Sequence, residues 1–339
     1  MLYGHGDNGY LYGQELIADF SSNVWYGGEP AGLKQHIFQQ WQCINKYPEV
    51  LAESLTEKVS RHHNLPPENI LINNGTTESI YLIAQAFKDK RTGIVIPSFA
   101  EYEDACRMFQ HLIHFIPWQE LEQNIPHHPA WLNTDLLWLG NPNNPTGDVL
   151  PALETLVRHH PQTIFVVDEA FIEFTNTIAS SIHLIQQLPN LVIQRSLTKA
   201  FAIPGLRLGY IAASKEVISR LRALKLPWSV NALALEAGNF IFDHYDTIKL
   251  PLTRLLQDRT EFSRQLQETG IRTYPSHTHF FLCETDSGDA SGLQKFLLNK
   301  FRLLIRNAGN FRGLSAQHFR LATLTPDKNQ WLINAIKEW

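Results

Sequence analysis

Short apolar runs alternate with helix-like segments between residues 70 and 210. The runs contain few polar positions, and most are followed by a turn or by the start of a helix. This pattern is typical of strands that are buried on both faces of a parallel sheet and joined by helices. The predicted strands are 70–72, 93–96, 112–117, 136–139, 164–167 and 191–193. The sequence therefore predicts an α/β fold with a doubly wound, mostly parallel sheet and its chemistry at the carboxyl ends of strands.

The pattern changes after residue 210, where longer helical segments precede a mixture of strands and helices. The predicted helices are 217–224, 232–245, 251–269, 293–301 and 329–338, and the predicted strands are 279–283, 303–306 and 319–322. We expect a large α/β domain over residues 46–225 and a smaller α+β domain over residues 226–339. Residues 1–45 are expected to join the small domain and to cover the active site.

Composition narrows the class of protein. The chain has 339 residues, 44% of them hydrophobic, and a net charge of -4, which favours neither nucleic acid nor an anionic membrane as a partner. The three cysteines are far apart and have neither disulfide nor metal-ligand spacing. No segment has the pattern of a signal peptide or the length of a membrane span. These features predict a cytoplasmic protein without a metal site.

The stretch 195–210 contains the densest candidate chemistry. Lys199 follows an apolar run and has Ser196 and Thr198 before it and Arg207 after it. Desolvation lowers the pKa of a lysine, so that its free amine can form an imine with a carbonyl compound. The hydroxyls and the guanidinium could hold a phosphate close to that amine. The alternative is a solvated lysine at the end of a strand.

Three other candidates follow predicted strands. Asp168 ends a buried apolar run, where a carboxylate needs a cation or a strong donor. Asn144 precedes Pro-Thr-Gly in a turn, and the run Gly75-Thr76-Thr77 opens a helix whose free N–H groups could bind a phosphate. Each also has a local explanation, because Asp168 could cap a helix, Asn-Pro is ordinary turn chemistry, and Thr-x-Glu can be a capping box.

Taken in this order, these residues resemble the pyridoxal-phosphate-dependent enzymes of fold type I, the aspartate-aminotransferase fold type. The resemblance implies that Lys199 carries pyridoxal 5'-phosphate as an imine and that Asp168 pairs with the pyridinium nitrogen. It also implies that Asn144 donates to the 3-oxygen of the ring and that Phe99 stacks on the ring, although Phe99 could equally be a core residue. The residues implied for the cofactor phosphate are Gly75, Thr76, Thr77, Ser196, Thr198 and Arg207.

The resemblance extends to the substrate and to a second subunit. Arg320 matches the arginine that binds the substrate α-carboxylate, and Arg306 matches one that binds a substrate phosphate in phosphate-specific subfamilies. Either arginine alone could instead form a structural salt bridge. Tyr47 matches a tyrosine that reaches the cofactor phosphate of the neighbouring subunit, which implies a homodimer with a shared active site.

Within the family, the chain is similar to the threonine-phosphate decarboxylases of cobalamin synthesis and, next, to the histidinol-phosphate aminotransferases. The runs that carry this similarity are 5–8, 20–23, 99–102, 227–232 and 305–307, together with Phe171. His5, Asn23 and Asn144 are the further residues implied at the substrate, although His5 could be a loop histidine without a role. The run Val24-Trp25-Tyr26 departs from the usual Asn-Pro turn, so that Trp25 and Tyr26 could narrow the pocket.

The implied reaction is decarboxylation of L-threonine O-3-phosphate to (R)-1-amino-2-propanol O-2-phosphate. The alternative is amino transfer from histidinol phosphate or an aromatic amino acid to 2-oxoglutarate. Both reactions begin at Lys199, and the outcome depends on which bond at Cα lies perpendicular to the cofactor ring. A third hypothesis is a non-catalytic relative that binds a partner or a nucleotide, and the combination of Lys199, Asp168 and Asn144 disfavours it.

Overall fold

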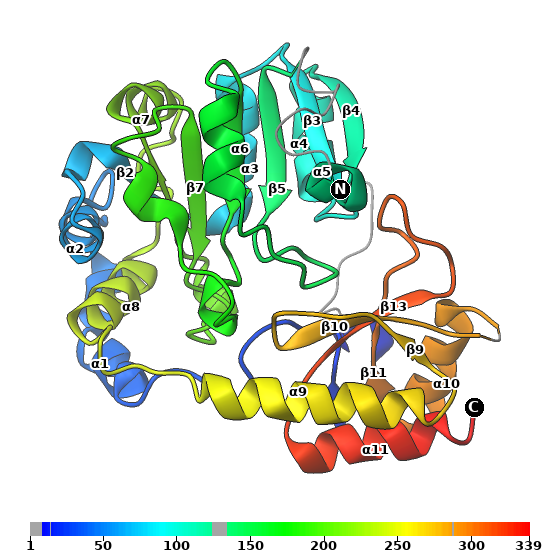
Figure 1. The fold of residues 1–339 in the computed structure, drawn as a ribbon. Helices are drawn as coiled ribbons and strands as arrows, with labels where there is room; N and C mark the ends of the chain where they lie inside the picture. The colour runs from blue at the N-terminus through cyan, green and yellow to red at the C-terminus, as the bar shows by residue number, and fades with distance from the viewer. Residues whose placement is uncertain (1–8, 14, 124–133, 287) are drawn as a thin grey trace.

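A seven-stranded sheet and a four-stranded sheet, together with a short two-stranded pairing, form the framework of the molecule (Figure 1). The computed structural model describes residues 9–13, 15–123, 134–286 and 288–339. The larger sheet has seven strands in the order β2-β8-β7-β6-β5-β3-β4. These are β2 (Ile70–Asn73), β3 (Arg91–Ile96), β4 (Leu112–Pro117), β5 (Leu136–Gly140), β6 (Ile164–Asp168), β7 (Leu191–Ser196) and β8 (Gly209–Ala213). Strand β8 is antiparallel to both of its neighbours, β2 and β7, and the other neighbouring pairs of this sheet are parallel, so the predicted α/β fold with a mostly parallel sheet is confirmed.

Helices cover both faces of the large sheet. Residues of α3, α4 and α7 form one core with one set of strand positions, and residues of α2, α5, α6 and α8 form a second core with the other set. On β6, for example, Val166 belongs to the first core and Val167 to the second. The apolar runs lack polar alternation because successive side chains enter different cores. These helices are α2 (Glu53–His63), α3 (Gly75–Ala86), α4 (Glu101–Met108), α5 (Trp118–Gln123), α6 (Leu153–His159), α7 (Lys215–Arg222) and α8 (Ala232–Asp243).

The smaller sheet has four antiparallel strands in the order β12-β13-β10-β9 and packs against α9, α10 and α11 (Figure 1). Its elements are β9 (Arg272–Thr273), β10 (Phe280–Glu284), β12 (Arg306–Asn307), β13 (His318–Ala322), α9 (Leu252–Gln267), α10 (Ala290–Phe301) and α11 (Pro326–Ile336). The run predicted as one strand over 303–306 is divided between β11 (Leu303–Leu304) and β12.

The N-terminal part of the chain packs with the C-terminal elements of the molecule. β1 (Ala18–Asp19) is parallel to β11, and Phe20 lies in the same core as α9 to α11. The chain then returns to the large sheet through α1 (Leu33–Gln39), which packs on α8.

Domain boundaries at residues 45 and 225 stay a prediction. Short 3₁₀ turns occur at Gly9–Tyr12, Trp41–Asn45, Pro67–Asn69, Ile172–Phe174, Ser181–Leu184 and Pro204–Leu206. Over the described ranges, none of the helices combines the length and apolar character needed to span a bilayer.

Candidate active site

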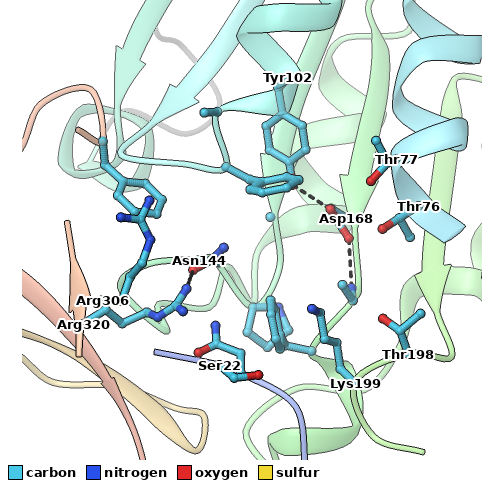
Figure 2. Close-up of a pocket in the computed structure, with 18 of the residues that line it drawn as sticks. Ser22, Thr76, Thr77, Tyr102, Asn144, Asp168, Thr198, Lys199, Arg306 and Arg320 are labelled. Carbon is cyan, nitrogen blue, oxygen red and sulfur yellow. Dashed lines mark hydrogen bonds between the residues drawn. The ribbon is translucent and has the colours of Figure 1, made fainter. Parts of the chain in front are cut away.

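The predicted site residues meet at the carboxyl ends of β5, β6 and β7. Register aligns Gly140 of β5 with Asp168 of β6, and Lys199 follows three residues after the end of β7. A cavity of about 210 Å³ lies at this edge, between the large sheet and the strands that carry Arg306 and Arg320 (Figure 2). Its lining includes Asn23, Thr76, Thr77, Phe99, Asn144, Asp168, Thr198, Lys199, Arg207, Arg306 and Arg320.

Asp168 is a buried acid that is held in one orientation. Its Oδ2 accepts a 2.7 Å hydrogen bond from the Tyr102 hydroxyl, and its Oδ1 accepts a 3.0 Å bond from the backbone N–H of Ala170. Burial raises the pKa of the Asp168 carboxyl, and the two hydrogen bonds act in the opposite direction without cancelling the effect of burial. A cationic ring nitrogen placed against this carboxyl would stabilise its charged form.

Lys199 faces the cavity from the turn after β7. Its carbonyl oxygen accepts a 3.0 Å hydrogen bond from the N–H of Trp25, which ties the N-terminal segment to this turn. Thr198 lines the cavity beside Lys199. Ser196 does not line it, but its Oγ lies 2.8 Å from Thr198 Oγ1 and so fixes the threonine side chain. Of the two predicted hydroxyls, that of Thr198 therefore lies at the cavity, and that of Ser196 contacts the cavity only through Thr198.

The start of α3 forms a cup of backbone N–H groups. Gly75 begins the helix with a φ of +77°, and a Cβ at this position would lie 2.6 Å from Nη2 of Arg207. Glycine therefore permits both the left-handed backbone and the close approach of the guanidinium. The Asn74 side chain makes no capping hydrogen bond to α3. The free N–H groups, with Thr76, Thr77 and Arg207 nearby, suit a phosphate.

Arg306 and Arg320 lie on the other side of the cavity. They are register partners on the antiparallel strands β12 and β13, so both side chains leave the same face of the small sheet. Burial lowers the pKa of Arg306 to about 10, and burial together with the charge of Arg306 lowers the pKa of Arg320 to about 9. Two buried cations side by side repel each other, which favours an anionic ligand between or beside them.

Asn144 connects the two sides of the site. Its Oδ1 accepts a 2.6 Å hydrogen bond from Nη1 of Arg320, and Nη2 of Arg320 donates to the carbonyl of Ser21 at 2.6 Å. Figure 2 shows the Asn144 side chain between Arg320 and the centre of the pocket, with Thr76 and Thr77 on the far side. Because Oδ1 is engaged by Arg320, the amide nitrogen of Asn144 is the group available as a donor to a bound ring.

Three predicted residues stand apart from the cavity lining. Gly75 starts α3 next to Thr76, and Ser196 contacts the side chain of Thr198. Tyr47 is 85% exposed, and its ring lies 5.4 Å from that of Trp228. Its expected contact with a neighbouring subunit stays a prediction. His5 lies outside the described residues.

Several side chains at the cavity were not predicted to have roles. Tyr102 orients Asp168, and Asn310 and Phe311 line the cavity close to Arg306. His279 does not line the cavity but contacts a residue that does: its buried ring hydrogen-bonds to the Asn23 carbonyl and stacks on Phe174, with ring centroids 3.8 Å apart. The position of Tyr102 three residues after Phe99, at the start of a helix, is the one sequence signal that could have indicated a shared face.

Comparison with known proteins shows the family of the chain. The model of the family "Aminotransferase class I and II" matches residues 17–336. The chain belongs to this family. It is 33% identical over 334 residues to threonine-phosphate decarboxylase of Salmonella typhimurium, covering 95% of this chain and 91% of the relative. It is also 32% identical over 310 residues to histidinol-phosphate aminotransferase of Caldanaerobacter subterraneus, covering 87% and 84% of the two chains.

The fold agrees with solved structures of the same two kinds of enzyme. The crystal structure of L-threonine-O-3-phosphate decarboxylase from Porphyromonas gingivalis has a TM-score of 0.91 and 39% identity, covering 95% of this chain and 99% of that one. Histidinol-phosphate aminotransferase from Clostridium acetobutylicum has a TM-score of 0.85 and 28% identity, with coverage of 95% and 98%. The fold is therefore fold type I.

Pyridoxal phosphate is the cofactor of this aminotransferase family, and the residues of the cavity fit it. Three groups surround one cavity: the buried carboxyl of Asp168, whose charged form a cation would stabilise, the amine of Lys199, and the start of α3, which has no side-chain cap. The described residues contain no group of three or more metal-ligating side chains.

Proposed function

We propose that this protein is a pyridoxal-phosphate-dependent lyase that decarboxylates L-threonine O-3-phosphate to (R)-1-amino-2-propanol O-2-phosphate, a reaction of cobalamin biosynthesis. The observation that carries the proposal is the cross-strand pair of buried arginines, Arg306 and Arg320, on the side of the cavity opposite Thr76 and Thr77. An amino acid phosphate ester has two anionic groups on one short carbon chain. Two guanidinium groups on neighbouring strands suit such a ligand.

The division of the cavity supports separate places for two phosphates. The cofactor phosphate is assigned to the start of α3, with Gly75, Thr76, Thr77 and Arg207, and with Ser196 supporting Thr198. The substrate phosphate is assigned to Arg306, and the substrate carboxylate to Arg320 with Asn23 nearby.

The residues have distinct tasks in the proposed reaction. When bound, pyridoxal phosphate accepts the electron pair that is left at Cα after a bond breaks. Asp168 provides a negative charge for the ring nitrogen, Asn144 a donor for the ring oxygen, and Phe99 a face for the ring. Arg320 and Arg306 orient the substrate so that its Cα–carboxylate bond is the one that breaks and CO2 leaves. Lys199, as an ammonium, then gives a proton to Cα.

A second candidate is amino transfer, because histidinol-phosphate aminotransferases are similar to this chain over most of its length. The same lysine would then remove a proton from Cα instead of adding one, and 2-oxoglutarate would be consumed. The purified holoenzyme should release CO2 from threonine phosphate without 2-oxoglutarate. Formation of glutamate from 2-oxoglutarate and histidinol phosphate, with no CO2 from threonine phosphate, would reject the lyase and favour the transaminase.

We further propose a cytoplasmic homodimer in which Tyr47 completes the partner's active site. Exposed apolar side chains occur in segments 38–50 and 226–228. Trp228 connects the two segments, because its ring contacts that of Tyr47 and its backbone N–H donates a 3.0 Å hydrogen bond to the Val50 carbonyl. An exposed apolar surface of this kind favours an interface. The three cysteines are free thiols, as expected in a reducing compartment.

A mixing experiment tests the shared site. Lys199→Ala and Tyr47→Ala proteins are each expected to be weakly active or inactive, whereas a mixture refolded together should regain activity. In the mixed dimer, one of the two sites combines the native Lys199 of the Tyr47→Ala subunit with the native Tyr47 of the Lys199→Ala subunit. A mixture no more active than the two separate proteins, or a monomer in solution, would contradict the proposed dimer.

A further inference from the structure

A loop between β12 and β13 connects the substrate arginines to helix α4. Residues 308–314 leave β12 directly after Arg306 and Asn307. Asn310 and Phe311 line the cavity, whereas Arg312 reaches away from it to the large sheet's side of the molecule. The loop therefore touches both the substrate side of the cavity and the helix that carries Tyr102.

The outer contact of this loop is a two-pronged ion pair. Nε and Nη2 of Arg312 donate to the two carboxylate oxygens of Glu103, at 2.9 Å and 2.7 Å. The guanidinium also lies over the ring of Phe115, 4.1 Å from its centroid. Parallel hydrogen bonds of this kind fix both position and direction, unlike a single contact with a flexible ammonium.

Glu103 is well placed to anchor the loop. Its side chain is only 8% exposed, and it lies in the first turn of α4, next to Tyr102. Burial acts to raise the pKa of Glu103, but hydrogen bonds from Arg312 and Arg107 outweigh burial and lower the pKa below its ordinary value. The carboxylate is therefore charged at neutral pH and attracts the loop.

The inner contacts of the loop hold Arg306. Asn310 Oδ1 accepts a 2.9 Å hydrogen bond from Nη2 of Arg306, and the Phe311 ring centroid lies 5.1 Å from the guanidinium carbon. Arg306 also donates to the carbonyl of Asn307. Two of these supports belong to the residues that immediately precede Arg312. Any shift of Arg312 would therefore move the supports of Arg306.

We propose that Arg312 and Glu103 form a positioning pair that fixes Arg306 at a set distance from the cofactor side of the cavity and so determines selectivity for phosphate-bearing substrates. The proposal rests on the proposed role of Arg306 as the ligand of the substrate phosphate. Neither Arg312 nor Glu103 touches the substrate. They act by holding the loop against α4, the same helix whose Tyr102 orients Asp168.

The experiment compares Arg312→Ala, Arg312→Lys and Arg107→Ala holoenzymes. Arg107 is a matched control, because it pairs with the same carboxylate at 2.7 Å but belongs to α4, the helix of Glu103 itself, and not to the loop. For each protein, kcat and KM are measured with threonine phosphate. The dissociation constant of unphosphorylated threonine is measured through the absorbance of the bound cofactor, and that of threonine phosphate through the absorbance change that follows rapid mixing, before the compound is consumed.

Arg312→Ala should raise the KM and dissociation constant of threonine phosphate by about tenfold or more, because a small displacement of a positioned group weakens its interactions strongly. The dissociation constant of threonine should change by less than about twofold, and the absorbance spectrum of the bound cofactor should stay the same. For threonine phosphate, Arg312→Lys should have constants between those of the wild type and Arg312→Ala. Arg107→Ala should resemble the wild type. If Arg312→Ala does not fold, Glu103→Gln tests the same pair and should shift the constants in the same direction.

The possible failures are distinguishable. Equal weakening of threonine phosphate and threonine, or an unchanged preference in Arg312→Ala and Glu103→Gln, would overturn the positioning role while the wild type still prefers the phosphate ester. A wild-type protein that binds both compounds equally would instead overturn the proposed function on which the inference rests.

Discussion

The hydroxyl of Tyr102 donates a 2.7 Å hydrogen bond to Oδ2 of Asp168, and the tyrosine ring stacks on Trp138 with centroids 5.1 Å apart. Helix α4 thereby fixes the direction of the acid at the end of β6. A carboxylate that is to face a ring nitrogen needs such a fixed direction, because its attraction to the cation depends on both distance and alignment.

Tyr102→Phe should reduce kcat/KM by roughly tenfold and weaken cofactor binding, since Asp168 loses one hydrogen-bond donor but the phenylalanine ring still fills the space of the tyrosine ring. Cofactor titration and steady-state kinetics measure both effects. Tyr81→Phe is the matched control, because the Tyr81 hydroxyl donates to Glu101 of the same helix at 2.8 Å. Equal losses in the two variants would indicate a general effect on α4.

Asp168→Asn should separate function from stability. Burial raises the pKa of Asp168 in the folded protein. Its favourable contribution to the free energy of unfolding is therefore present at low pH and is lost as the pH rises through the folded-state pKa. At pH 7 the cofactor-free variant should therefore be as stable as the wild type or more stable by about 1 kcal/mol, although its activity is lost. Denaturant unfolding measures this difference, and a clear destabilisation would contradict it.

The positions of the candidate site residues could be predicted where they follow from local pattern. Lys199, Asp168 and Asn144 each follow a buried apolar strand, and parallel strands bring such positions to one edge. In contrast, the pairing of Arg306 with Arg320 depends on the break at Ile305 and on register, neither of which the single predicted strand 303–306 contained. Strand β8 was also missed, because its short run follows the lysine stretch without a turn signal.

Contacts between distant segments could not be predicted for a similar reason. The hydrogen bond from Tyr102 joins α4 to β6, and the ion pair of Arg312 joins α4 to a loop more than two hundred positions away. Neither partner carries a sequence pattern that identifies the other. Such contacts arise only after the sheets have packed, so hydrophobic periodicity contains no information about them.

Lys199→Ala should leave the fold intact and abolish turnover. The hydrogen bond between the Trp25 N–H and residue 199 uses the backbone carbonyl, so the substitution preserves it. Borohydride treatment followed by mass measurement should attach the cofactor to the wild type but not to this variant. Lys215→Ala is the control, since Lys215 lies on the surface with a side chain 65% exposed. Full turnover in Lys199→Ala would reject the assigned role.

His279 should make stability depend on pH. Burial lowers its pKa from 6.5 to about 3, an effect that the bond to the Asn23 carbonyl opposes and the charges of Arg320 and Lys199 reinforce. Below pH 6.5 the unfolded chain therefore binds a proton that the folded protein does not, and the free energy of unfolding falls as the pH falls towards 3.

His279→Gln should remove this dependence while it keeps a side-chain donor for the Asn23 carbonyl. Between pH 7.5 and pH 5.0, the wild type should lose about 2 kcal/mol more unfolding free energy than the variant. Loss of the stack on Phe174 lowers the stability of the variant at both pH values, so only the difference between the two pH values is informative. His63, whose pKa is also lowered to about 3, contributes equally to both proteins. Identical pH dependence in urea unfolding would mean that His279 is protonated in the folded protein or that the structure opens around it.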